Sequence, residues 1–137
     1  MEKTEQGAKD YMKSFIIDFE KHFIRYFLRV VPGGKAELKT KIFSQKIKGL
    51  TKNGHSLEIK VSFNEEEGIR KWNEFSGGQK TVLALCIILA VQKCSPTPFC
   101  VLDEVDAALD PFYVEKLVEV IIEESEFCQY FITSFKK

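Results

Sequence analysis

Two short motifs combine residue types that could bind a terminal phosphate and hydrolyse it. The first is Ser76-Gly77-Gly78-Gln79, which stands directly before an apolar stretch of helical character. Two glycines leave backbone N–H groups uncovered at a helix start, where the helix dipole also favours an anion. The Ser76 hydroxyl and the Gln79 amide extend this set of donors. Taken alone, Ser76 is equally well explained as an ordinary N-cap.

The second motif is the apolar run Phe99–Leu102 followed by Asp103 and Glu104. Ligands of parallel α/β sheets bind outside the carboxyl ends of the strands, which is where these two acids would lie. Asp103 suits Mg²⁺, a hard ion that keeps part of its hydration shell. Glu104 suits the orientation or deprotonation of an attacking water. The alternative for the dipeptide alone is a pair of capping acids.

The elements that must position these motifs follow from the hydrophobic pattern. Aromatic and aliphatic residues recur at spacings of three and four from Tyr11 to Val30, which predicts a helix. Val31-Pro32-Gly33-Gly34 should end it. The polar segment Met1–Asp10 is expected to be a frayed terminus or the stub of a longer element.

Two alternating segments, Lys35–Ile42 and Leu57–Phe63, predict half-buried strands of an antiparallel hairpin or meander. The stretch between them holds Gly49 and Asn53-Gly54, so we expect a loop or turn there.

The remaining elements alternate helix and strand. Ser76 should open a helix that runs to about Lys93, and Phe99–Leu102 should be a strand buried on both faces. A helix from Phe112 to about Glu124 and a last buried strand at Gln129–Thr133 follow. The inner face of that helix is expected to comprise Val114, Leu117, Val118, Ile121 and Ile122. This βαβ order predicts an α/β fold with a parallel sheet and covering helices.

Composition excludes several classes of protein. The chain has 137 residues, enough for one domain, and 20 basic residues balance 20 acidic ones, so no bulk charge favours nucleic acid or a membrane surface. The four cysteines form no Cys-x-x-Cys pair and only two histidines are present, which favours reduced, buried thiols over zinc. No signal peptide or membrane span is recognisable, so we expect a soluble, intracellular protein.

Order and spacing make the motifs specific. The acids are followed by Val105-Asp106-Ala107-Ala108-Leu109-Asp110, and the whole series resembles the signature, Walker B and D-loop of the ATP-binding-cassette (ABC) class of P-loop ATPases. Val91-Gln92-Lys93-Cys94 and Pro98-Phe99 sharpen this to a resemblance to the SMC family of chromosome-structuring ATPases. Val30–Ala36 is similar to the third subunit of that family, which belongs to cohesin.

The resemblance implies the C-terminal lobe of an SMC ATPase head. Residues 1–31 would form the base of the coiled coil and the first helix, and residues 35–137 the lobe with the signature and Walker B motifs. It further implies ATP and Mg²⁺ as cofactors, a role in sister chromatid cohesion and chromosome organisation, and a location on chromosomes in the nucleus.

The same resemblance implies roles for individual residues. Across the interface, the γ-phosphate of an ATP on the opposing head would be contacted by the signature residues Ser76, Gly77, Gly78 and Gln79. On this head, Asp103 would hold the Mg²⁺ shell and Glu104 would position the water. Asp110 would cross the head–head interface. Ser134 stands about where the ABC class places its switch histidine, and a γ-phosphate contact there would be weaker.

No Gly-x-x-x-x-Gly-Lys-Ser/Thr string occurs in the sequence, and Val31–Lys35 has the wrong spacing. We therefore expect the isolated chain to be inactive and to need the N-terminal lobe of the same SMC protein for its P-loop. We also expect it to be a C-terminal piece whose last elements are absent after Lys137.

Two alternatives to this assignment stay open. One is another SMC subunit or a coiled-coil DNA-repair ABC ATPase, and the other is a non-catalytic assembly module.

The resemblance further implies two partners, an opposing SMC head in a heterodimer and a kleisin subunit. It implies no association with a membrane. The aromatic stripe Phe15, Phe19, Phe23 and Phe27 is expected to pack in the lobe or against the returning coiled coil, with a kleisin groove as the alternative. Trp72 and Tyr113 are expected to pack as well. Five lysines suggest either a solvated face or contact with DNA: Lys39, Lys41, Lys46, Lys48 and Lys52.

Overall fold

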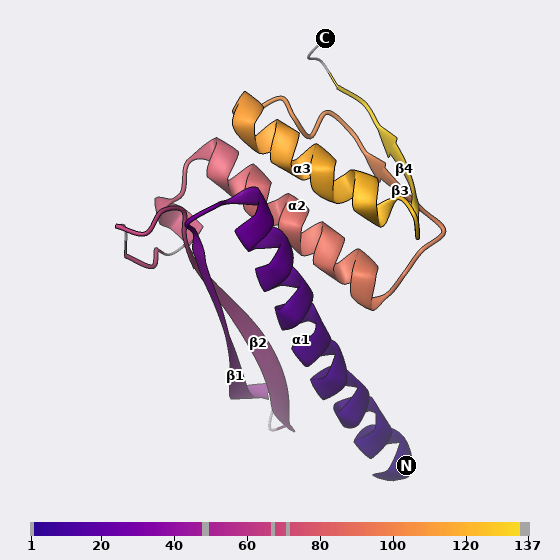
Figure 1. Ribbon diagram of the computed structural model, residues 1–137. Coiled ribbons are helices and arrows are strands. Elements are labelled where there is room, and N and C mark those ends of the chain that lie inside the picture. The colour runs from indigo at the N-terminus through magenta and orange to yellow at the C-terminus, as the bar shows by residue number, and fades with distance from the viewer. Residues whose placement is uncertain (1, 48–49, 67, 71, 135–137) are drawn as a thin grey trace.

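The computed structural model describes the backbone of residues 2–47, 50–66, 68–70 and 72–134, and their side chains apart from those of residues 2–6, 8–9, 41–47 and 50–55. Figure 1 shows two parts: a long helix with a hairpin beside it, and a β-α-β unit at the other side, with helix α2 running between α1 and α3. The elements are α1 (Glu2–Val30), β1 (Lys35–Ile47), β2 (Leu50–Ser62), a 3₁₀ turn η1 (Trp72–Glu74), α2 (Gly77–Cys94), β3 (Phe99–Leu102), α3 (Pro111–Glu124) and β4 (Gln129–Ile132).

Helix α1 begins at Glu2, so the expected frayed segment is helical from Glu2 to Asp10. Of the two expectations for this segment, the frayed terminus was wrong, because Glu, Lys, Gln and Ala in this stretch are good helix formers and Gly7 alone does not break the helix. The helix ends at Val30, as predicted, and the Val31 N–H still donates to the Phe27 carbonyl at 2.8 Å. Gly33 then takes a φ of 78°, which glycine adopts at no steric cost.

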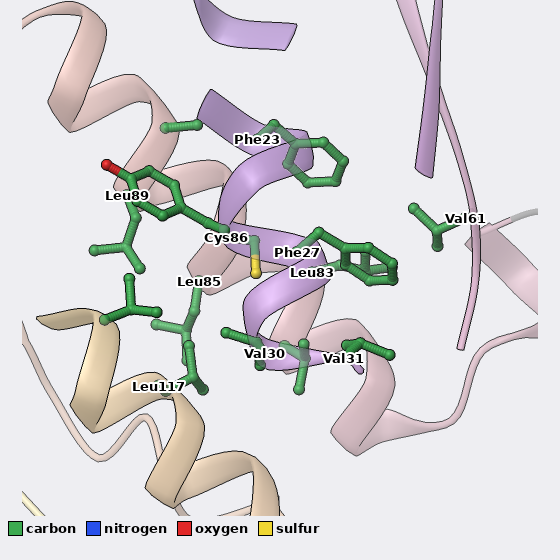
Figure 2. Close-up of a cluster of buried hydrophobic side chains, with 14 of the residues drawn as sticks. Phe23, Phe27, Val30, Val31, Val61, Leu83, Leu85, Cys86, Leu89 and Leu117 are labelled. Atoms are coloured by element: carbon green, nitrogen blue, oxygen red, sulfur yellow. The ribbon is translucent and has the colours of Figure 1, made fainter. Parts of the chain in front are cut away.

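The aromatic stripe of α1 packs into the core, as predicted. Phe19, Phe23 and Phe27 are buried, Phe15 is partly buried, and neighbouring rings stack with centroids 6.0–6.3 Å apart. Figure 2 shows Phe23 and Phe27 of α1 among side chains of α2, with Val61 of β2 on one side and Leu117 of α3 on the other. The stripe therefore joins the hairpin to the β-α-β unit.

Strands β1 and β2 form an antiparallel hairpin, and their register runs from Lys35 opposite Ser62 to Ile47 opposite Leu50. Both strands are longer than predicted. Asn53 and Gly54 lie within β2, opposite Ser44 and Phe43, so the turn predicted at this dipeptide was wrong. Gly49, the other residue on which that prediction rested, lies outside the described residues. Asn-Gly favours a turn, but tertiary pairing overrides that local preference here. Of the five lysines, only the side chain of Lys39 is described, and it pairs with Glu37 at 3.2 Å.

Strands β3 and β4 pair in parallel, with Phe99 opposite Gln129 and Leu102 opposite Ile132, which confirms the predicted β-α-β order. The expectation that they are buried on both faces was wrong. Phe99, Val101 and Phe131 are 57%, 61% and 50% exposed, and together they form what we call the open face of the sheet. A continuous apolar run predicts cover on both sides, but the described residues cover only one.

Helix α3 begins with Pro111 at its first turn and buries Leu117, Val120 and Ile121. Val118 and Ile122, expected on its inner face, are 44% and 63% exposed. Tyr113 packs edge-on against Phe63, as predicted, whereas Trp72 is half exposed.

Within the described residues, no helix combines the length and apolarity needed to cross a membrane.

Ion pairs fasten α3 to the other two helices. Glu123 pairs with Arg29 of α1, and Glu124, only 6% exposed, accepts from Lys93 of α2 at 2.8 Å. Burial raises the pKa of Glu124, but the hydrogen bond and charge of Lys93 outweigh it and hold the pKa below its ordinary value. The position of α3, and with it the preceding loop, is thus set by polar contacts as well as by the core.

Candidate functional site

The signature motif is held by a local capping box. Ser76 is the N-cap of α2 in an extended conformation, and its Oγ accepts from the Gln79 N–H at 3.2 Å. In return, the Ser76 N–H donates to Gln79 Oε1 at 3.0 Å. The box satisfies two of the backbone donors that a helix start leaves over.

The donors that the box leaves unused are those suited to an anion. They are the backbone N–H groups of Gly77 and Gly78, the Ser76 hydroxyl proton and the Gln79 side-chain amide, for which no acceptor occurs among the described residues. Ser76 and Gly77 are exposed. Since the helix dipole adds partial positive charge at this end, the arrangement fits a phosphate presented from outside the lobe.

Gly78 is required by a close approach to another motif. A Cβ at this position would lie 2.8 Å from the carbonyl oxygen of Ala108, in the loop before α3. Carbon and oxygen atoms do not approach that closely, so any side chain here would push the two segments apart. The signature helix and the D-loop-like segment are therefore in direct backbone contact, which spacing along the chain did not predict.

The two acids lie at the carboxyl end of β3, as predicted, and both are exposed. Glu104 has a φ of 52°, the one positive φ outside glycine in the described part of the chain. This left-handed conformation costs a residue with a Cβ roughly 1–2 kcal/mol. Strained backbone persists only where surrounding contacts fix it, and it occurs often at functional sites.

Those fixing contacts come from Thr133, the residue after β4. The Glu104 N–H donates to Thr133 Oγ1 at 2.9 Å and also approaches the Thr133 carbonyl oxygen at 3.2 Å. The same hydroxyl donates its proton to Asp103 Oδ1. The Thr133 N–H in turn donates to the Leu102 carbonyl at 3.0 Å, which extends the parallel ladder past the strands.

The D-loop-like segment is a series of tight turns. The Ala107 N–H donates to the Glu104 carbonyl at 3.2 Å, and the Leu109 N–H donates to the Asp106 carbonyl at 3.1 Å. Asp110 is the N-cap of α3, with Oδ1 accepting from the Phe112 N–H at 2.9 Å, and it is exposed.

The Ser134 hydroxyl donates to the buried carboxylate of Asp106. It is thus already engaged with the D-loop-like segment, and its contact with a γ-phosphate stays a prediction.

The residues present fit a Mg²⁺ ion that is held jointly by the protein and a nucleotide. Among the residues with described positions, no three His, Cys, Asp or Glu side chains gather as a metal cage. Mg²⁺ is commonly held by one or two carboxylates together with phosphate oxygens and water, a role that an exposed Asp103 suits. Asp103 would therefore suit a Mg²⁺ ion that a bound nucleotide also holds.

These features together define an ABC-type ATPase head lobe: a capped signature helix, a pair of acids after a parallel strand, and a tight loop that follows the acids and contacts the signature helix. The model of the RecF/RecN/SMC N terminal domain matches residues 5–137, and the chain belongs to that family. Within it, the chain is an SMC ATPase head lobe, as the motifs indicated.

Named relatives support the likeness to the third SMC subunit. The protein named Structural maintenance of chromosomes protein 3 of Caenorhabditis elegans is 32% identical over 124 residues, covering 85% of this chain and 10% of the relative. The protein of that name from Dictyostelium discoideum is 35% identical over 132 residues, covering 84% and 9%. The chain thus spans about a tenth of the length of these relatives.

Solved structures confirm the fold. The Smc head domain with a coiled coil and joint from Pyrococcus yayanosii superposes with a TM-score of 0.78 at 27% identity, covering 98% of this chain and 25% of that one. A structure titled as the SmcHead bound to the C-winged helix domain of ScpA gives a TM-score of 0.73 at 27% identity, covering 92% and 36%.

The structure groups the predicted site residues into two sets. Asp103 and Glu104 follow β3 and contact Thr133 after β4, and the signature contacts the D-loop-like segment at Gly78. The sequence did not predict that Thr133 holds the acids or that Ala108 contacts Gly78. A usable signal existed for Thr133, because a hydroxyl directly after a strand parallel to β3 must lie at the same sheet edge as the acids.

Proposed function

We propose that this lobe supplies half of each of two ATP sites in a pair of engaged SMC heads. Asp103 and Glu104 serve the ATP bound to this head, and the signature serves the ATP bound to the opposing head. The observation that carries the proposal is the strained Glu104, held beside Asp103 at the carboxyl edge of a parallel strand pair. A purely structural acid pair would give no reason for holding Glu104 in a costly conformation.

In its own site the chain would act through two carboxylates. Asp103 would orient water molecules around Mg²⁺, with one oxygen already fixed by Thr133. When bound, Mg²⁺ neutralises charge on the phosphate oxygens. Glu104 would hold the attacking water in line and accept its proton, and its exposed position leaves room for that water.

In the opposing site the chain would act through the signature. The Gly77 and Gly78 N–H groups, the Ser76 hydroxyl and the Gln79 amide would donate to γ-phosphate oxygens from the other side of the interface. Asp110 would lie at the same interface. ATP would then join two heads, since neither head alone presents both sets of groups.

A P-loop must come from elsewhere, and we assign it to the N-terminal lobe of the same protein. The open face of Phe99, Val101 and Phe131 supports this, because apolar strand surface of this kind is normally covered in a parallel sheet. The chain alone would therefore be inactive. The larger setting, following the relatives, is a heterodimer of SMC heads in sister chromatid cohesion and chromosome organisation, in the nucleus, with a kleisin partner and with DNA as a further candidate.

The test is ATP hydrolysis by this lobe assembled with its N-terminal lobe and the opposing head. Glu104→Gln keeps shape and hydrogen bonding but cannot accept a proton, so we expect hydrolysis at that site to fall about 100-fold or more. ATP-dependent head engagement should persist. Unchanged hydrolysis would remove the catalytic role and favour the non-catalytic assembly module.

A second substitution tests the role in trans. Ser76→Arg should abolish ATP-dependent engagement of the two heads while this head still binds ATP, because the bulky side chain would block the opposing phosphate. Equal dimerisation of the variant and the unaltered protein, measured by light scattering with ATP, would refute the assignment of the signature.

A further inference from the structure

Thr133 makes contacts to both acids that no other described residue makes. Its Oγ1 accepts from the Glu104 N–H at 2.9 Å and donates to Asp103 Oδ1, so one hydroxyl joins the backbone of one acid to the side chain of the other. A hydroxyl has a single proton, and its donation to Asp103 leaves the lone pairs free to accept from Glu104. The direction of both hydrogen bonds is thereby fixed.

We propose that Thr133 is a positioning residue for ATP hydrolysis, one that holds Glu104 in its left-handed conformation and Asp103 in register with it. The proposal rests on the proposed function of the two acids. Thr133 does not touch the reacting atoms. It acts through the backbone of Glu104, since φ at that residue decides where the carboxylate points.

Two features make the hydroxyl, and not the bulk of the side chain, the determinant. Thr133 is exposed, so its methyl group contributes little to the core. Its backbone N–H bond to Leu102 and its carbonyl contact to Glu104 survive any side-chain change. A substitution that removes only the hydroxyl therefore leaves the strand in place. It frees Asp103 Oδ1 and leaves the Glu104 N–H with only the longer contact to the Thr133 carbonyl.

The experiment compares kcat and KM for ATP in the assembled full-length heads. Thr133→Val replaces the hydroxyl by a methyl group of similar shape, and we expect kcat to fall about ten- to hundredfold, as small misplacements of reacting groups do. KM should stay within about twofold, because nucleotide binding relies on groups that are unchanged. Thr133→Ser, which keeps both hydrogen bonds, should restore kcat.

Thr97→Val is the matched control. Thr97 precedes β3 at the opposite end of the strand pair, and its hydroxyl has one proton to share between two acceptors, Gln92 Oε1 at 3.0 Å and the Phe99 carbonyl at 2.8 Å. The same substitution there should leave kcat unchanged. Thr133→Ala, without the added methyl group, is made alongside in case the valine variant fails to assemble, and it should match the expected loss.

The outcomes separate this inference from the proposed function. If Glu104→Gln abolishes hydrolysis while Thr133→Val and Thr133→Ala retain full kcat, the positioning role is refuted and the catalytic role stands. If Thr133→Ser loses as much as Thr133→Val, or if Thr97→Val loses as much, the hydroxyl is not the determinant. If Glu104→Gln has no effect, the proposed function itself fails.

Discussion

The signature and the acid pair are both polar motifs at the end of an apolar element, but they are positioned in opposite ways. Ser76 and Gln79 hold each other, three residues apart, through a capping box. Asp103 and Glu104 are held by Thr133, about 30 residues away along the chain. The signature therefore forms whenever α2 forms, whereas the geometry of the acids depends on β4 docking beside β3.

This difference fits the roles proposed for the two motifs. A motif that meets a phosphate on another molecule must keep its shape before contact, and a local box achieves that. A motif that performs chemistry gains when its geometry depends on completed folding of the sheet, because hydrolysis is then confined to an assembled head. Substitutions that act on one motif and leave the other unchanged test this difference between local and remote positioning.

The largest expected effect comes from Glu104→Gly. Without the carboxylate, hydrolysis should fall about 100-fold or more. Without the Cβ, the positive φ costs nothing, so the folded state should gain about 1 kcal/mol relative to Glu104→Ala, which keeps the strain. We expect the glycine variant to melt above the alanine variant, as measured by calorimetry on the assembled head.

This ranking is the reverse of the usual one, since glycine is ordinarily less stable than alanine because of its unfolded-state entropy. A glycine variant that melts at or below the alanine variant would show that Glu104 is not strained in solution. In that case Thr133 would not be needed to hold Glu104 in a strained conformation.

Sequence predicted the local motif better than the remote one, for the same physical reason. Ser76 as N-cap, the start of α2 and the parallel pairing of β3 with β4 all follow from short patterns. Contacts between distant segments, such as Thr133 with Glu104, depend on register and packing that no single segment encodes.

The errors have specific causes too. The Asn53-Gly54 signal favours a turn, yet thirteen-residue strands pair through it, because cross-strand pairing along the hairpin outweighs one dipeptide. The strands β3 and β4 look buried on both faces because their composition suits a complete sheet. Their open face of Phe99, Val101 and Phe131 stays exposed among the described residues, which agrees with the proposal that an N-terminal lobe covers it.

A second, smaller effect is expected from Gly78→Ala, which acts where the two motifs are linked. Its Cβ would lie 2.8 Å from the Ala108 carbonyl, so the signature helix and the loop before α3 must separate. We expect ATP-dependent head engagement to weaken about tenfold, and stability to fall by about 1–3 kcal/mol, as in other overpacked contacts. Gly77→Ala, which meets no atom within 4 Å, is the matched control for stability.

The readout is the ATP concentration for half-maximal engagement, measured alongside the melting temperature. Equal stability of the two alanine variants would mean that the signature and the loop are not in backbone contact, and the link between the motifs would be lost. A stability loss confined to Gly78→Ala, with engagement impaired in proportion, would establish it.

The smallest effect is expected from Ser76→Ala. It removes the Ser76 half of the capping box, while the N–H of residue 76 can still donate to Gln79. The loss of an N-cap costs about 1 kcal/mol of folding free energy. Because the box is local, its loss should not change the geometry of Asp103 and Glu104. We therefore expect the single-turnover rate at this head's own site, measured on engaged heads at saturating ATP, to match that of the unaltered protein. Thr133→Val should give the opposite pattern, with slow turnover at that site and normal engagement. If Ser76→Ala slows this head's own chemistry as much as Thr133→Val does, the two motifs are not independently positioned, and the contrast between local and remote control does not hold.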